Sequence, residues 1–299
     1  MNLRQIELLR AVMRCETTVR AAQELGLSQP AVSNAIKHLE GQVGFPLFER
    51  VNNRLFPTAE ARAIYQDSDP IFQMHAALEA KVQDLKENRA GHVRLIATPP
   101  LGYSVIPRAL GSFLAKRPKM RVFFDVRRFE NVIDSVENGV AELGFVMGLN
   151  ENRALNAEVF FSERMVCVMR PDHPLAEKNT IYPSDLRSVP FIALERGSRM
   201  GTIVRQAFTE AGEPFNFAVE VRYCNTACVL AENGVGVAVV DPLSPLFSGH
   251  YNLAIRAFEP AVQVSASVVS SRKRPLSRAA EAFLREVRVV VGEVAGKLA

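Results

Sequence analysis

The segment from Glu24 to Gly44, ELGLSQPAVSNAIKHLEGQVG, constrains the fold of this chain more than any other stretch. Gly26 ends one helical pattern, because glycine tolerates the left-handed backbone with which many helices close. Ser28 offers a cap to a second helix, and Pro30 stands in the first turn, where helices accept proline. Two helices joined by so tight a turn predict a helix-turn-helix.

The second helix has an apolar stripe and a polar remainder. The stripe consists of Val32, Ile36, Leu39 and Val43. Polar side chains of the kind found there can read base edges in the major groove, since Gln and Asn pair with adenine and Lys reaches guanine or phosphate. An ordinary helical hairpin with a solvated polar face is the alternative on spacing alone.

The run FPLFERVNNRLFP, residues 45–57, predicts two short extended pieces around a turn. Arginines on both sides of that turn suit a wing that grips phosphates beside the groove. The residues that we expect to contact DNA are Thr18, Arg20, Ser28, Gln29, Pro30, Ser33, Asn34, Lys37, His38, Arg50, Asn53 and Arg54.

Composition is compatible with this interpretation without proving it. The chain has 299 residues, 48% of them hydrophobic, a net charge of +4 and a pI near 9.0. That length suggests two or three domains with real cores. No apolar run approaches the ~18 residues of a membrane helix, and the first residues lack the pattern of a signal peptide. We therefore expect a cytoplasmic protein that has no membrane partner.

A seven-residue repeat follows the predicted wing. Ile64, Ile71, Leu78 and Leu85 recur at this spacing, which favours a helix packed along another helix. Packing against the chain's own body is the alternative. Pro70 lies inside this segment and removes one helical hydrogen bond, so the helix could be kinked there.

From His92 onward, short apolar strands alternate with helical patterns, which predicts an α/β fold with mostly parallel sheets. Gly234 and Gly236 follow a helix and precede a strand, which is the wrong order for a dinucleotide loop, so we expect no cofactor. Cys224 and Cys228 stand four residues apart, but no histidine or further cysteine is near them. We interpret them as packing residues and predict no metal site.

The segment AAQELGLSQPAVSNAIKHLEGQVGFPLFER, residues 21–50, resembles the N-terminal signature of LysR-type transcriptional regulators. Chain length and the order of elements downstream are also similar to that family. There are two departures: Thr58-Ala59-Glu60-Ala61 lacks the glycine that family members often carry after the wing, and Pro70 interrupts the linker.

The resemblance implies a multidomain protein: an all-α winged helix-turn-helix head, a long linker helix, and an α/β effector domain of two subdomains like a periplasmic binding protein. The expected boundaries are 1–60 for the head, 61–90 for the linker, and 91–299 for the effector domain. Within the effector domain we expect subdomain I at 91–162 and 267–299, and subdomain II at 163–266. The resemblance further implies a homodimer or homotetramer held by the linker helices, double-stranded DNA with a split, roughly palindromic site, and RNA polymerase as a further partner.

A small effector should bind where strands end, between the subdomains. The loop residues that we expect there are Thr98, Pro99, Pro100, Gly148, Ser198, Met200, Gly201, Thr202, Asn225, Thr226 and Asp241. Hydroxyls and helix starts suit a carboxylate, and Asp241 or Glu195 could hold a positive group. For each residue, a capping or turn role is the alternative.

Residues 226–242, TACVLAENGVGVAVVDP, resemble regulators of lysine synthesis and opine catabolism, which implies an amino-acid-like or opine-like effector and control of its metabolic genes. A small carboxylate of another kind remains an alternative. A solute-binding component would leave the head unexplained. An enzyme is not expected, because the chain shows no recognisable nucleophile–base set.

Overall fold

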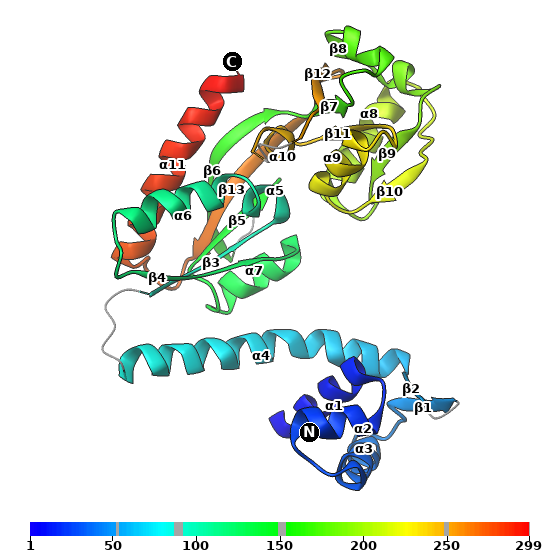
Figure 1. The fold of residues 1–299 in the computed structure, drawn as a ribbon. Coiled ribbons are helices and arrows are strands. Elements are labelled where there is room, and N and C mark those ends of the chain that lie inside the picture. The colour runs from blue at the N-terminus through cyan, green and yellow to red at the C-terminus, as the bar shows by residue number, and fades with distance from the viewer. Residues whose placement is uncertain (52–53, 87–91, 149–153, 248–250, 299) are drawn as a thin grey trace. The chain divides into compact units, whose positions relative to one another are not determined.

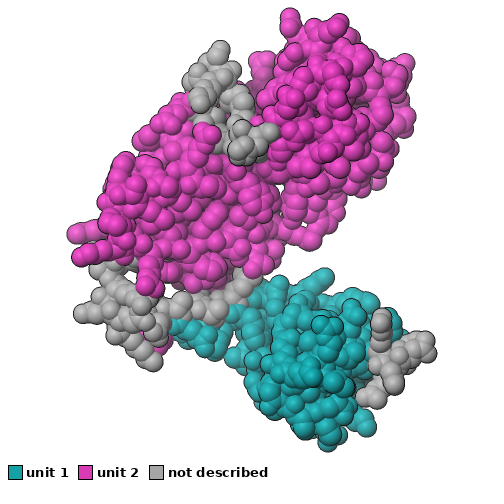
Figure 2. Space-filling view, viewed as in Figure 1, with its two compact units in different colours: residues 1–80 teal, residues 81–299 magenta. Residues whose placement is uncertain are grey.

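The computed structural model describes residues 1–51, 54–86, 92–148, 154–247 and 251–298. The chain divides into two compact units, residues 1–80 and 81–299 (Figure 2). Each unit has a hydrophobic core of its own. Among the described residues, no helix is both long enough and apolar enough to span a bilayer.

The first unit begins with the head (Figure 1). Its elements are α1 (Leu3–Cys15), α2 (Thr18–Leu25), α3 (Gln29–Val43), β1 (Phe48–Val51) and β2 (Arg54–Pro57). Side-chain caps start all three helices: Asn2 caps α1, Thr17 caps α2, and Ser28 accepts a hydrogen bond from the N–H of Ala31 at the start of α3. Left-handed Gly26 ends α2, so the tight turn falls where the sequence predicts it.

The core of the head consists of the apolar stripes of its helices. Leu9, Val12 and Val32 are fully buried, and Leu39 is nearly so. The Glu40 carboxylate accepts hydrogen bonds from the backbone N–H groups of Leu47, at 2.8 Å, and Phe48, at 3.2 Å. Glu40 lies on α3 and Phe48 opens β1, so these bonds tie the start of the wing to the second helix of the turn.

Helix α4 (Ala59–Lys86) runs unbroken through Pro70 (Figure 1). Ile64 packs against the core of the head, so for this residue the alternative of packing on the chain's own body holds. By contrast, Ile71 and Leu78 are exposed, and the side chain of Leu85 lies outside the described part of the structure. Four apolar side chains of α4 have exposed fractions between 42% and 60%: Ile71, Met74, Leu78 and Val82.

The second unit contains two sheets. The first has the order β4-β3-β5-β13-β6. Its strands are β3 (His92–Ala97), β4 (Arg121–Val126), β5 (Leu143–Met147), β6 (Leu155–Arg164) and β13 (Gln263–Ser271). The core on one face includes side chains of α6 (Val105–Ala115) and α11 (Arg278–Leu298), and α7 (Phe129–Glu137) packs on the other face. A short helix, α5 (Pro99–Gly102), follows β3.

The second sheet has the order β10-β9-β11-β7-β12-β8. Its strands are β7 (Val166–Met169), β8 (Thr180–Ile181), β9 (Phe191–Leu194), β10 (Val219–Val221), β11 (Val237–Val240) and β12 (Ala254–Phe258). Its helices are α8 (Arg199–Glu210), α9 (Cys224–Glu232), α10 (Leu243–Phe247) and the 3-10 turns η1 (Pro174–Glu177) and η2 (Pro183–Leu186). Phe208 of α8 packs ring against ring with Phe191 of β9 and with Phe215.

The chain passes between the two sheets twice, at Met165 and across residues 259–262. Glu163 and residues 263–266 therefore belong to strands of the first sheet, a few residues away from the boundaries that we expected. Strands β6 and β13 pair antiparallel, because one leaves the first sheet and the other returns to it. In the second sheet, β7 pairs antiparallel with β11 and β12. Both sheets are therefore mixed, although the sequence predicts mostly parallel ones.

Candidate functional site

The polar face of α3 is directed away from the core of the head. Gln29, Asn34 and Lys37 are exposed, as are Ser28, Pro30 and His38, while Ser33 is half-buried. On α2, Arg20 is exposed and Thr18 is half-buried. The apolar stripe of α3 is buried within the same unit, so the amphipathic pattern leaves its polar side chains available to a partner.

Gln29 links the two helices of the turn. Its side-chain Nε2 donates to Oγ1 of Thr18, at 3.1 Å, and to Oγ of Ser33, at 2.9 Å. The amide therefore has a defined position before any partner binds, which lowers the entropy cost of binding. Sequence spacing alone did not reveal this link.

The wing is partly described. Strands β1 and β2 pair antiparallel, with Arg50 opposite Leu55 and Val51 opposite Arg54. The side chains of Arg50 and Arg54 lie outside the described part of the structure, as does the whole of Asn53.

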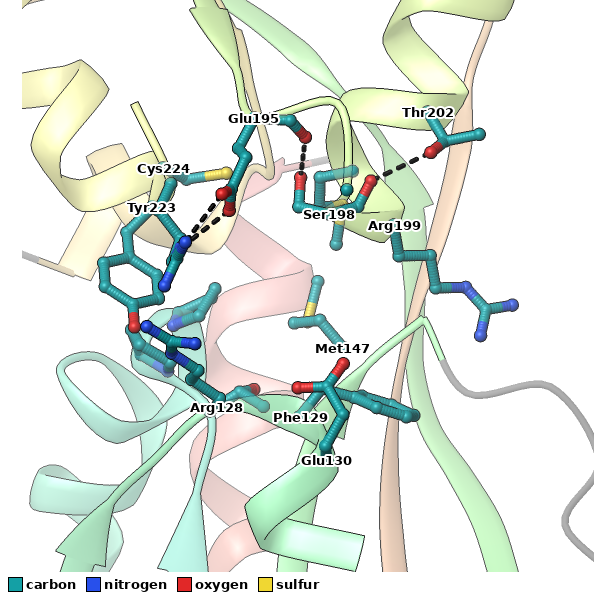
Figure 3. A pocket seen from close by; sticks show the side chains of 16 residues that line it. Arg128, Phe129, Glu130, Met147, Glu195, Ser198, Arg199, Thr202, Tyr223 and Cys224 are labelled. Atoms are coloured by element: carbon teal, nitrogen blue, oxygen red, sulfur yellow. Dashed lines mark hydrogen bonds and ion pairs between the residues drawn. The ribbon is translucent and has the colours of Figure 1, made fainter. Parts of the chain in front are cut away.

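In the second unit, residues around the ends of both sheets enclose a pocket of about 590 Å³ (Figure 3). The first sheet and its helices contribute Thr98, Pro99, Pro100, Arg128, Phe129, Glu130 and Met147. The second contributes Glu195, Gly197, Ser198, Arg199, Met200, Thr202, Arg222, Tyr223 and Cys224. The volume suits a small organic molecule.

Four helices begin at this pocket. Thr98, Arg128, Ser198 and Tyr223 are the N-cap residues of α5, α7, α8 and α9, and each follows a strand. Of the four, Ser198 alone caps its helix with its own side chain, which accepts from the N–H of Gly201 at 3.0 Å. Helix N-termini carry partial positive charge and unpaired N–H groups, so the pocket favours an anion.

Charged side chains add to this polarity. Arg222 donates two hydrogen bonds to Glu195, each 2.6 Å long, and chiefly this bonding lowers the pKa of Glu195. Within the described ranges, Arg128 and Glu130 have no ion-pair partner, and Figure 3 shows both directed into the pocket from the start of α7. Arg199 lies on the opposite side from Arg128, and burial lowers its pKa.

The hydroxyl groups of the pocket are largely used by the backbone. Ser198 Oγ donates to the Glu195 carbonyl at 2.7 Å, and Thr202 Oγ1 lies 3.0 Å from the Ser198 carbonyl. Thr98 Oγ1 lies 3.4 Å from the Phe145 carbonyl. These residues therefore have the capping and turn roles that the sequence left open. The arginines and the helix N–H groups supply the positive charge that an anion would contact.

Two family models match the chain. Residues 3–62 match the bacterial regulatory helix-turn-helix protein of the lysR family, and residues 86–291 match the LysR substrate binding domain. The chain belongs to the LysR family. It is a DNA-binding transcriptional regulator with an effector-binding domain, and its relatives are regulators rather than enzymes.

The relatives extend over nearly the whole chain. The transcriptional activator protein LysR of Escherichia coli K12 is 29% identical over 282 residues, covering 94% of this chain and 91% of that protein. The regulatory protein NocR of Agrobacterium fabrum C58 is 29% identical over 280 residues, 94% of this chain and 93% of that protein. The crystal structure of CbnR, a LysR family transcriptional regulator, is 20% identical, with a TM-score of 0.73 and coverage of 97% and 99%. The predicted fold class is confirmed, except that the head is not all-α, because its wing consists of the paired strands β1 and β2.

In this LysR-family chain, six of the predicted effector residues line the pocket and five do not. Those that line it are Thr98, Pro99, Pro100, Ser198, Met200 and Thr202, and those that do not are Gly148, Gly201, Asn225, Thr226 and Asp241. Gly148 packs under Arg199 instead, and Asn225 and Thr226 lie within α9 behind its first residue. Thus the strand ends do meet at a pocket, but not every side chain near them lines it.

Asp241 is the clearest correction. Its carboxylate is completely buried and accepts hydrogen bonds from the N–H of Leu243, from the N–H of Ser244 and from the Ser244 hydroxyl. It therefore caps α10 instead of holding a positive group of an effector. Glu195, the other residue considered for that role, is already paired with Arg222.

Residues that the sequence analysis missed include Arg128, Phe129, Glu130, Arg222 and Tyr223. They lie between a strand and the helix after it, or at the start of that helix: Arg128, Phe129 and Glu130 after β4, and Arg222 and Tyr223 after β10. The strand-end rule that found Thr98 extends to these residues only once it is known where their strands end. What the sequence did not show is that these two strands end at the same edge as β3 and β9.

The cysteines behave as packing residues. Cys167, Cys224 and Cys228 are buried free thiols, and burial raises the pKa of each. A thiol with a raised pKa is a poor nucleophile and a poor metal ligand. Among the described residues, no cluster of three or more His, Cys, Asp or Glu side chains could hold a metal ion.

Gly201 is required by packing, which a pair of glycine variants can test. A Cβ at Gly201 would lie 2.2 Å from the Glu195 carbonyl oxygen, whereas a Cβ at Gly197, which lines the same pocket, meets nothing within 4 Å. Gly201→Ala should lower the unfolding free energy by at least about 1–3 kcal/mol, the usual cost of overpacking. Gly197→Ala should change it by less than about 0.5 kcal/mol. Denaturant unfolding of both variants is the measurement, and equal stability would contradict the assignment.

The buried Asp241 carboxyl should make stability depend on pH. Burial raises its pKa in the folded protein, against the opposing effect of the Ser244 hydrogen bonds. A raised folded-state pKa disfavours the charged form, so stability falls as pH rises from the ordinary aspartate range, near about 3.9, up to the raised value. Asp241→Asn keeps the shape without the charge. Thermal unfolding from pH 4 to pH 8 should show the variant gaining on the wild type as pH rises, and a constant difference would contradict this.

Proposed function

We propose that this LysR-family regulator senses a small zwitterionic effector, an amino acid or an opine-like derivative, and controls the genes for its metabolism. The observation that carries the proposal is the convergence of α7, α8 and α9 on one pocket that also contains charges of both signs. The lining contains three arginines and two glutamates, Glu130 and Glu195, so it has an excess of positive charge.

The anionic end of the effector is assigned to Arg128 and the nearby helix starts. Arg128 belongs to the first subdomain, whereas the Arg222–Glu195 pair and Tyr223 belong to the second. A carboxylate between Arg128 and the start of α9 would touch both subdomains at once. Such a ligand favours one relative arrangement of the subdomains, which is the physical requirement for coupling to a distant site.

The cationic end is assigned to Glu130. This carboxylate points into the pocket two residues beyond Arg128, and its sequence neighbour Phe129 and Met147 supply apolar surface beside it (Figure 3). Glu195 is less suited, because its two oxygens already accept from Arg222. An amino group near Glu130 and a carboxylate near Arg128 match the two ends of an amino acid.

One relative supports the opine alternative within this class. The octopine catabolism/uptake operon regulatory protein OccR of Rhizobium meliloti is 29% identical over 294 residues, 96% of this chain and 95% of that protein. Its name links that regulator to an amino-acid derivative. Effector preference can change with few pocket residues, so the name guides the choice of compounds to test.

A small carboxylate without an amino group is the second candidate. The excess of arginines over glutamates in the lining favours it, because a purely anionic ligand would need no partner for a positive group. The two candidates differ in the role of Glu130. It would attract an ammonium group but would repel a simple carboxylate.

For DNA, we infer that α3 enters the major groove and that Gln29, Ser33 and Asn34 read base edges. Lys37 and the wing arginines then contact phosphates. The exposed apolar stripe of α4 supports pairing with a second copy, which would present two heads to a split, roughly palindromic site. Dimers of dimers follow the family pattern, and contact with RNA polymerase would change as effector binding shifts the heads.

An effector screen tests the proposed sensing. Full-length protein should melt at a higher temperature with its effector than without it, because a ligand that binds only the folded state stabilises it. The panel is amino acids, octopine, nopaline and simple carboxylates. Arg128→Gln should lose most of the shift. Arg127→Gln is the matched control, since Arg127 pairs with Asp125 and does not line the pocket.

Glu130→Gln separates the two effector classes. With an amino-acid or opine effector, the variant should bind more weakly, by about tenfold for a loss of about 1.4 kcal/mol. With a simple carboxylate, it should bind equally or more tightly. Isothermal titration with the compound found in the screen measures the difference. In the effector screen, an equal rise of melting temperature in wild type and in Arg128→Gln would refute the placement of the effector.

A double substitution tests the DNA face. Ser33→Ala with Asn34→Ala should weaken specific binding to the operator by at least about tenfold, because each well-formed base contact contributes about 1–3 kcal/mol. Folding and oligomeric state should not change, since Asn34 is exposed and Ser33 is only half-buried. A mobility-shift assay against operator and competitor DNA is the measurement. Unchanged operator affinity would count against the groove assignment.

A further inference from the structure

Helix α4 has a weak turn close to the head. Pro70 has no N–H, so the Gln66 carbonyl, four residues earlier, loses its helical hydrogen-bond donor. Proline within a helix ordinarily produces a kink at that point. Nevertheless α4 is a single helix from Ala59 to Lys86.

One side chain from α1 bonds to this turn at several points. Arg10 Nη1 donates to the Tyr65 carbonyl at 3.3 Å and to the Ser68 hydroxyl at 2.9 Å, and its Nη2 lies 2.5 Å from a carboxylate oxygen of Asp69. The Ser68 hydroxyl in turn donates to the Tyr65 carbonyl at 2.7 Å. These bonds hold the residues that directly precede Pro70.

Aromatic rings and burial complete the arrangement. The Arg10 guanidinium lies over the ring of Tyr65, 4.7 Å from its centroid, and over the ring of Phe72, at 4.8 Å. These rings come from either side of Pro70. The Arg10 side chain is only 13% exposed and Ser68 is 3% exposed, so water does not replace these contacts readily.

We propose that Arg10 is a positioning residue for DNA recognition: it stiffens α4 at Pro70 and thereby fixes the direction in which the linker helix leaves the head. In a dimer held by α4, that direction sets the distance between the two recognition helices. Arg10 therefore determines which spacing of half-sites the regulator prefers, without touching DNA. The inference rests on the proposed dimeric recognition of a split site.

The planar guanidinium is essential to this role. It bonds two acceptors and a carboxylate while stacking on two rings, and lysine cannot reproduce that geometry. An exposed ion pair would contribute little, as is expected for Arg4 with Glu7 on the same helix, whose side chains are 62% and 42% exposed. Arg4→Met is therefore the matched control for Arg10→Met.

The experiment is a binding selection with full-length protein on duplexes whose two half-sites are separated by spacers of varied length. Wild type should prefer one spacer at least about tenfold over a spacer changed by about five base pairs, half a helical repeat. Arg10→Met should reduce this preference to about threefold or less, while affinity for a single half-site changes less than about twofold. Arg4→Met should behave as wild type.

Pro70→Ala provides a second variant, because alanine restores the N–H that bonds the Gln66 carbonyl. In that background, Arg10→Met should broaden the spacer preference much less. If Arg10→Met broadened the spacer preference equally with and without Pro70, or did not broaden it at all, the role of Arg10 would be overturned. The proposed dimeric recognition would still stand. A wild type that selects no split site would overturn both this inference and the proposed dimeric recognition, so the two failures are distinguishable.

Discussion

The pocket proposed for the effector depends on a constraint of parallel strands. A helix that follows a strand in such a sheet begins at the edge where the strand ends, so every such helix points its positive end to the same side. Here β3, β4, β9 and β10 all end at the pocket, and the helices after them begin there. The concentration of N–H groups and arginines at one place follows from this connectivity and does not need a dedicated motif.

The head depends on the two faces of α3, one apolar and one polar. The stripe of Val32, Ile36 and Leu39 is buried against α1 and α2, and this burial leaves Gln29, Asn34 and Lys37 directed outward. Burial of an apolar stripe contributes several kcal/mol, far more than the polar face contributes to folding. The polar face is thus left exposed and available for the proposed role in DNA recognition. Glu40 and Arg10 then attach the wing and the linker helix to this small core.

Much of this organisation could be predicted from local sequence. Gly26, Ser28 and Pro30 determine a helix boundary by their own backbone and side-chain chemistry, and the structure has that boundary where they place it. Likewise, strand ends indicated Thr98, Ser198 and Thr202. The same rule wrongly included Asp241, because a carboxylate after a strand can equally turn back and cap the following helix. It omitted Arg128, because nothing in the sequence shows that β4 lies beside β3.

By itself, the sequence determined the turn, the amphipathic second helix of that turn, the family and the alternation of strand and helix, since all of these depend on residues close together in the chain. Only the tertiary structure decided which charges meet. Glu195 pairs with Arg222, and Arg10 bonds to a turn of α4 more than fifty residues away. Such contacts depend on sheet order and helix packing, which are set by the burial of the whole core rather than by any short segment.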